Sequence, residues 1–254
     1  MKNPIKNLML AIPLALGLGA CATEKVIIGP ELSDAVETAK EACSGLVLTL
    51  AYHDLAGHAS LYKQLGVGYD FAIKVGPIES STQGVTSDWG GMPAGIFGKA
   101  ELSEEQMDSL RISGLQATQD LYYKINKNLN ESEHGEYEGN NFDHWMALFA
   151  GTDFMSYYVR DRFVSERGGL SDVSGLLERG YEKDIDGAFI ANIIGNGPDL
   201  VWHLARGMGL EMSKPEIYRF RIPGTSLEAE VRPTAYMDQS NRMLAPGFRA
   251  EIKF

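Results

Sequence analysis

Apolar positions recur at helical spacing through the middle of the chain. Ser103 and Gln106 have the spacing of a capping box, which marks a helix start. We therefore predict a long amphipathic helix after Ser103, with one apolar face formed by Met107, Leu110, Leu115, Leu121, Tyr122, Ile125 and Leu129. Asp34 and Glu37 give the same start signal for a helix towards Cys43. A further helix, rich in aromatic residues and weakened near Gly151 and Thr152, is predicted from Phe142 to about Val164.

Other segments have strand patterns. Between Ala59 and Val75 we predict one strand around Leu61, a turn at Gly66–Gly68, and a second strand in which Phe71, Ile73 and Val75 alternate with polar or small residues. The last forty residues contain three short alternating runs separated by Pro and Gly, namely Ile217–Ile222, Leu227–Val231 and Phe248–Phe254, which predict a small antiparallel meander. The apolar run Leu46–Tyr52 fits either a buried strand or a helix.

The remaining long apolar segment, Asp186–Leu210, contains Asn, Asp, His and Arg residues, which favour buried helices over a membrane span. Pro198 predicts that two such helices join near Gly195–Pro198. The fold class is therefore α+β. We expect a core domain over 31–165, and a helical extension with a C-terminal β segment of the same domain over 166–254.

The N-terminus has the layout of a secretory signal, with Lys2 and Lys6 before a short apolar run that is too short to span a bilayer. The run ends in Leu18-Gly19-Ala20-Cys21, which resembles the lipobox of bacterial lipoproteins. This resemblance implies that 1–20 is a signal peptide, that Cys21 carries lipid such as palmitate, and that 21–30 is a tether. Ala22 is not the Asp that tends to retain such proteins at the inner membrane. The resemblance thus implies a lipid-anchored protein at the outer membrane, facing the periplasm.

The net charge and the cysteine content limit which partners and which covalent links are expected. Removal of the signal changes the net charge from −11 to −13, because Lys2 and Lys6 are lost. An acidic body argues against nucleic acid and anionic head groups as partners, so the expected membrane contact is through the lipid on Cys21. Cys43 is the only other cysteine, and no internal disulfide is expected.

Two distant segments together suggest a site. The first places His58 at the start of a predicted strand and Asp70 on the next strand. The second, Asn141-Phe142-Asp143-His144-Trp145, opens the predicted helix. A base, an orienting group and a helix N-terminus are the parts that a thiol hydrolase needs.

These segments resemble the circularly permuted papain-like superfamily, which includes lecithin:retinol acyltransferase-like proteins and relatives of NlpC-type peptidases. The resemblance implies a papain-like core in which His58 is the base, Asp70 is the third member, and Asn141, Phe142, His144 and Trp145 form the helix motif. Phe142 occupies the position of the nucleophilic cysteine, and phenylalanine cannot attack a carbonyl. The resemblance therefore implies a cleft that binds a ligand rather than cleaving it, unless Phe142 and Trp145 are simply core residues.

Cys43 offers an alternative nucleophile. Cys43-Ser44-Gly45-Leu46-Val47 is similar to the motif of unpermuted NlpC-type peptidases. Ala42 stands where those enzymes usually have Asp, however, and only fifteen residues separate Cys43 from His58.

A metal site is a further alternative, with His53, Asp54 and His58 joined by His144, Asp153 or His203. His53 and His58 are five residues apart, and on an α-helix this spacing points them in different directions. We therefore predict no metal and no cofactor.

The sequence predicts a membrane-anchored envelope lipoprotein whose papain-like cleft binds a peptidoglycan or lipid ligand. Two alternatives stay open: an active hydrolase or acyltransferase on peptidoglycan or lipid bonds, and a structural or assembly lipoprotein with no small-molecule site.

Overall fold

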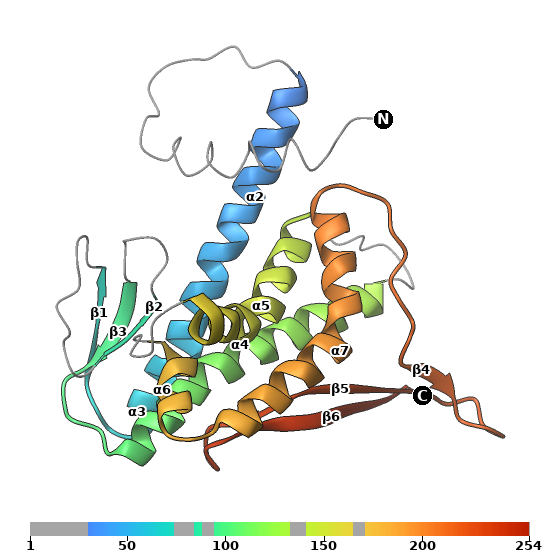
Figure 1. Cartoon of the computed structure of the whole chain (residues 1–254). Coiled ribbons are helices and arrows are strands. Elements are labelled where there is room, and N and C mark those ends of the chain that lie inside the picture. Colours follow the sequence, from blue (N-terminus) through green and yellow to red (C-terminus); the bar gives the residue numbers. More distant parts are fainter. Residues whose placement is uncertain (1–29, 74–83, 88–93, 133–140, 165–170, 254) are drawn as a thin grey trace.

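The fold is α+β, as a computed structural model of the chain shows (Figure 1). The structure describes residues 30–73, 84–87, 94–132, 141–164 and 171–253. Their helices are α2 (Pro30–Tyr52), α3 (Ser60–Gln64), α4 (Glu104–Ser132), α5 (Asn141–Val159), α6 (Asp172–Glu178) and α7 (Glu182–Gly207), with π-helical segments η1 (His53–Ala59) and η2 (Arg160–Val164). Their strands are β1 (Tyr69–Ile73), β2 (Gly84–Ser87), β3 (Ala94–Gly98), β4 (Arg219–Arg221), β5 (Glu228–Asp238) and β6 (Met243–Lys253).

The segments α2, η1 and α3 form one continuous helical run, so Leu46–Tyr52 is helical. The strand predicted around Leu61 is wrong. Leu61 and the adjacent Tyr62 are both buried, as is His58 one turn earlier, and this burial follows the helical period rather than strand alternation. Gly66, at a φ of +69°, lies in the turn after α3. The second predicted strand is present as β1, and its last residues, including Val75, lie outside the described residues.

Helix α4 begins as predicted, because Ser103 accepts a hydrogen bond from the Gln106 backbone while the Gln106 side chain accepts one from the Ser103 backbone. The helix predicted from Phe142 is α5, and it is regular through Gly151. A Cβ at Gly151 would lie 2.7 Å from Leu200 and 2.8 Å from Tyr122. Gly151 therefore allows α5 to approach α4 and α7 closely, and the helix changes to π geometry only at η2.

The prediction of two helices joined near Gly195–Pro198 is also wrong, because α7 is a single helix that contains Pro198. A Cβ at Gly195 would lie 1.6 Å from the backbone oxygen of Pro233 on β5. The helix is thus packed directly on the strand at this point. Such tertiary contact outweighs the local helix-breaking tendency of Gly and Pro.

Two three-stranded antiparallel sheets complete the fold, in the orders β1-β3-β2 and β4-β5-β6. The second sheet is the predicted C-terminal meander, with longer second and third strands than the sequence runs suggest. One buried cluster joins side chains of α4, α5, α6, α7, β5 and β6, namely Ile112, Leu115, Phe154, Tyr157, Tyr158, Val173, Leu176, Ile185, Ala188, Ala235, Met237 and Leu244. The C-terminal elements therefore share a core with α4 and α5.

Among the described helices, none has both the length and the apolar character that crossing a bilayer requires.

Candidate metal centre

Two histidines and two aspartates meet between the helices. His53, Asp54 and His58 come from η1, and Asp172 is the first residue of α6. The Nε2 atoms of His53 and His58 are 3.1 Å apart. Oδ2 of Asp172 lies 3.0 Å from the first of these nitrogens and 3.5 Å from the second. All four side chains are buried, and a carboxylate oxygen of Asp54 lies within 4.8 Å of ligand atoms of both histidines.

The π-helical geometry of η1 brings the two histidines together. On an α-helix, residues five apart point about 140° away from each other. In a π-helix the backbone hydrogen bond itself joins residues five apart, so their side chains point to the same side. The spacing of His53 and His58, which argues against a metal site on an α-helix, therefore favours one here. Short π-helical segments of this kind are frequent at functional sites.

Two glycines let η1 and α4 approach closely enough to enclose the site. A Cβ at Gly57 would lie 2.5 Å from Cα of Gly114, and a Cβ at Gly114 would lie 2.2 Å from Nε2 of His53. No side chain larger than hydrogen fits at either position without movement. The His53 ring thus occupies space that only Gly114 leaves open.

Hydrogen bonds on the far side of each ring determine which nitrogen faces the centre. The backbone oxygen of Leu110 lies 2.9 Å from Nδ1 of His58 and can only accept, so this nitrogen carries the proton. Nδ1 of His53 lies 2.8 Å from Oδ2 of Asp153, which also accepts a 2.8 Å hydrogen bond from Thr118. Both Nε2 atoms are therefore available to the centre. This arrangement of carboxylate, imidazole and ligand site is typical of metal-binding histidines.

The three ligand atoms have the separations that a tetrahedral ion needs. With bonds of about 2.0–2.1 Å, the ligand atoms of a tetrahedral zinc site are about 3.3 Å apart. The observed separations are 3.1, 3.0 and 3.5 Å. The centre of the triangle is about 1.9 Å from each atom, so an ion at zinc bonding distance would lie just outside its plane. The candidate for a fourth ligand is Asp54, which has a carboxylate oxygen within 4.8 Å of ligand atoms of both histidines.

The electrostatics favour a cation. Burial by itself lowers the pKa of His53, but the carboxylates of Asp153 and Asp172 outweigh it and hold this pKa well above its usual value. Burial raises the pKa of Asp172, yet His58 and His53 outweigh it and lower this pKa to about 2. Burial raises the pKa of Asp54, with partial compensation from the histidines. The carboxylates thus favour positive charge at this site, which a proton on His53 or a cation that displaces this proton can supply.

Two buried oxygens in this cluster have no hydrogen-bond partner in the described part of the chain, Oδ1 of Asp54 and Oδ1 of Asp172. A buried carboxylate oxygen without a partner costs free energy, unless a cation or a proton compensates for it. A divalent ion bound to these carboxylates would remove that cost.

The structure does not assemble the catalytic site that the papain-like resemblance implies. His58 lies in η1 and not at the start of a strand, because its helix continues through α3. Asp70 lies on β1, is mostly exposed, and pairs with Lys99 at 2.8 Å. Cys43 is half-buried on α2, fifteen residues before His58 in the same helical run, which separates them by about 22 Å along the axis.

The residues of the helix motif lie in the first turns of α5. Asn141 and Phe142 are half-buried, while His144 and Trp145 are buried. Nδ1 of His144 lies 3.0 Å from Nδ1 of His203 on α7, so His144 belongs to a second histidine pair. Cys21 and residues 22–29 of the predicted tether lie outside the described residues, and its last residue, Pro30, begins α2.

Sequence reasoning considered His53, Asp54, His58 and Asp153 together, but it missed Asp172. The signal for Asp172 is weak, because Asp is common in the first turn of any helix. Ser171 caps α6 by accepting a hydrogen bond from the Ser174 backbone. This cap fixes where α6 begins and hence where Asp172 points.

Comparison of the chain with protein-family models, with curated proteins and with solved structures found no match.

Proposed function

We propose that this protein binds one divalent transition-metal ion, with zinc as the favoured ion, through His53, His58, Asp172 and Asp54. The observation that supports the proposal most directly is the convergence of two histidine Nε2 atoms and one carboxylate oxygen within 3.0–3.5 Å of one another. Imidazole suits several transition metals, and carboxylates complete such sites.

Within this proposal the ion has a structural role. Its ligands come from η1 and α6, and the groups that orient the histidines come from α4 and α5. All four ligands are buried, and four protein ligands leave no open position for substrate. The ion would join elements that are far apart in the sequence, and its binding free energy would add to the stability of the fold.

The test is the metal content of the full chain purified without chelators, measured by plasma mass spectrometry. We expect about one equivalent of zinc per chain, and a loss of most of it in Asp172→Asn. Asp199→Asn is the matched control, because Asp199 is an equally buried aspartate that instead pairs with Arg232 at 2.7 Å. Absence of stoichiometric metal, or equal metal content in the two variants, would contradict the proposal.

A second proposal concerns attachment to the envelope. The sequence Leu18-Gly19-Ala20-Cys21 supports lipidation at Cys21 and anchoring at the outer membrane. Cells fed labelled palmitate should label the wild-type chain and not Cys21→Ala, and the variant should leave the membrane fraction. An unlabelled wild-type chain would refute this proposal and leave the metal proposal untouched.

A further inference from the structure

Helix α7 buries several polar side chains among its apolar ones and exposes a stripe of aliphatic side chains. Its buried face has polar residues at helical spacing, namely Asn192, Asn196, Asp199 and His203. Its exposed face has Ile190, Ile193, Ile194 and Val201, whose exposed fractions lie between 45 and 57 %. The apolar stripe extends about 17 Å along the helix. On an ordinary surface helix the exposed face is mainly polar.

The buried polar residues have partners that hold the helix in this orientation. Asp199 accepts a hydrogen bond from Arg232 on β5, and Asn196 donates to Asn192. His203 contacts His144 and lies 3.1 Å from Oδ1 of Asn126 on α4. Rotating α7 to hide the isoleucines would break these contacts. The apolar stripe is therefore a fixed feature of the surface.

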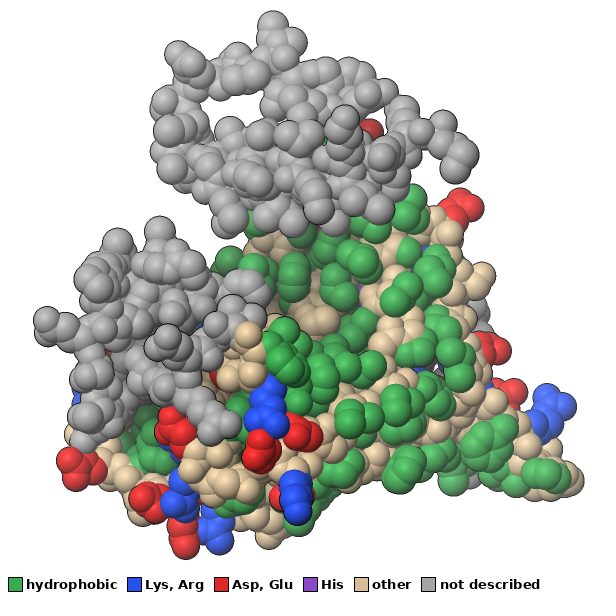
Figure 2. Space-filling model, in the orientation of Figure 1, with side chains coloured by type: hydrophobic (Ala, Val, Ile, Leu, Met, Phe, Trp, Pro, Cys, Tyr) green, Lys and Arg blue, Asp and Glu red, His purple; other side chains and the backbone are tan. Residues whose placement is uncertain are grey.

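The stripe continues onto the end of α5 and η2. Tyr158 stacks on Phe189 with ring centroids 3.9 Å apart, and it also contacts the ring of Phe163 with centroids 6.2 Å apart. Phe163 is 73 % exposed, and Val159 is also exposed. We call the six exposed residues Val159, Phe163, Ile190, Ile193, Ile194 and Val201 the apolar surface. Figure 2 shows hydrophobic side chains over much of the face that α5 and α7 present, with charged side chains mainly at its margins.

We propose that the apolar surface contacts the acyl chains of a lipid bilayer. A surface of this kind marks an interaction site in a soluble domain. Five of its six residues are aliphatic or β-branched, and none is the Trp, Tyr or Arg that dominates protein–protein contacts. Aliphatic side chains of this type are as apolar as lipid tails and need no complementary shape.

The place where the chain is anchored supports lipid as the occupant, and this step rests on the proposed lipidation of Cys21. Nine residue steps separate Cys21 from Pro30, the first residue of α2. Fully extended, they reach about 30 Å. The tether would therefore keep the first residue of α2 within about 30 Å of the bilayer, so the apolar surface would meet lipid at a high effective concentration. The net charge of −13 that remains after Lys2 and Lys6 are removed with the signal predicts contact through apolar burial rather than through charge.

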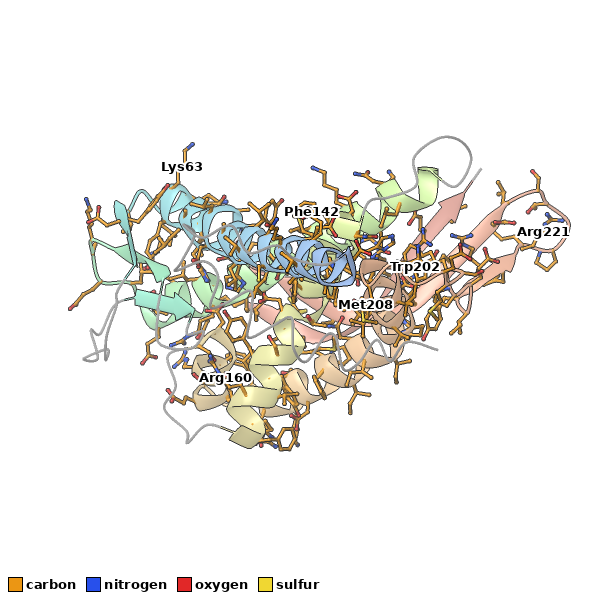
Figure 3. The ribbon with its side chains drawn as sticks, turned by 90° about the horizontal axis from the view of Figure 1, so that it is seen from above. Lys63, Phe142, Arg160, Trp202, Met208 and Arg221 are labelled. Atoms are coloured by element: carbon orange, nitrogen blue, oxygen red, sulfur yellow. The ribbon has the colours of Figure 1, made fainter. Side chains whose placement is uncertain are left out.

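The test uses the lipidated full chain in phosphatidylcholine vesicles, with Cys43→Ser and one environment-sensitive fluorophore on a new cysteine. The test variant is Ile193→Cys and the control is Lys63→Cys. Figure 3 shows Lys63 and Arg160 on opposite sides of α2, and Arg160 follows Val159 of the apolar surface in the sequence. We expect a blue-shifted emission for the probe at 193, quenched at least about threefold more by nitroxide on lipid acyl chains than the probe at 63.

Two results would overturn the inference. Equal aqueous quenching at both positions would show that the apolar surface faces water. A blue shift at 193 without quenching by lipid nitroxide would show that protein covers it, as in a dimer. Mass spectrometry of the same sample reports the lipid on Cys21, so that a failed anchor is distinguished from a failed surface.

Discussion

Two buried histidine pairs in this molecule have nearly the same geometry and opposite electrostatics. The ring nitrogens of His53 and His58 are 3.1 Å apart, and those of His144 and His203 are 3.0 Å apart. Around the first pair lie carboxylates, which hold the pKa of His53 well above its usual value. Burial, Arg206 and Lys214 lower the pKa of His144 to about 4.

The hydrogen bonds of the second pair explain the difference. Asn126 presents its oxygen both to Nε2 of His203 and to the ammonium of Lys214. His203 therefore carries its proton on Nε2, and its Nδ1 accepts from Nδ1 of His144. This pair is satisfied as two neutral rings. Histidine pairing alone thus does not indicate a metal site, and the surrounding charge decides.

The largest contrast should come from removing one ring of each pair. His58→Ala should lower bound metal from about one equivalent to less than about a tenth, because a ligand is lost. His203→Ala should keep the metal while destabilising the fold. Plasma mass spectrometry of both purified variants measures the metal content. Equal metal loss in the two variants would show that the two histidine pairs do not differ in metal binding.

Substitution of a glycine should damage the first pair selectively. Gly114→Ala places a Cβ 2.2 Å from Nε2 of His53, so we expect metal loss and destabilisation of about 3 kcal/mol. Gly197→Ala, within helix α7, is the control, because a Cβ at this position would meet no atom within 4 Å. This substitution should raise the free energy of unfolding by about 0.5–1 kcal/mol. Urea unfolding followed by circular dichroism measures both changes. Matching behaviour of the two variants would show that the space at Gly114 is not critical.

Acid should destabilise the fold through the second histidine pair, His144 and His203. Because the pKa of His144 is about 4 in the folded chain and about 6.5 when unfolded, the unfolded state binds more protons between these values. The free energy of unfolding contributed by this group is constant above about pH 6.5 and falls by up to about 3 kcal/mol as the pH falls to 4. Urea unfolding at several pH values should show a shallower decline in His144→Asn than in the wild type. Parallel curves would mean that His144 is not a neutral buried ring.

The smallest effect should come from Asp153, whose carboxylate contacts Nδ1 of His53 on the side of the ring away from the proposed metal. Asp153→Asn leaves all four ligands but removes the negative charge that faces Nδ1 of His53, so zinc affinity should fall about 10- to 100-fold. Competition with a fluorescent zinc chelator measures the affinity. Asp70→Asn, at an exposed aspartate on β1, serves as the control and should not change it.

Periodicity predicted the parts of the fold in which local and tertiary preferences agree. The capping box at Ser103 and the apolar face after it define α4, and alternation with Pro and Gly turns defines the C-terminal meander. The errors arose where tertiary contact decides. Leu61 lies in a helix because the run from α2 continues, and α7 passes through Pro198 because Gly195 packs on β5.

The candidate centre was only partly predictable. His53, Asp54 and His58 could be grouped from their proximity in the sequence, but the argument against them assumed α-helical geometry. The π-helical geometry of η1 was not predicted from the sequence, and the close approach of Gly57 to Gly114 is seen only once α4 has packed against η1. Asp172 is more than a hundred residues away from His53 and becomes a candidate only when the fold brings α6 to η1.

The π-helical geometry of η1 also bears on how related chains could differ in length. A π-helical segment inside an α-helix corresponds to one inserted residue. Leu55 and Ala56 are exposed, and either could be deleted without removing a ligand. Such a deletion would restore α-helical geometry with the two histidines four residues apart, so both rings would still point to one side of the helix. A one-residue gap at this place in an alignment of related chains would therefore keep every ligand and the shared face of the two histidines.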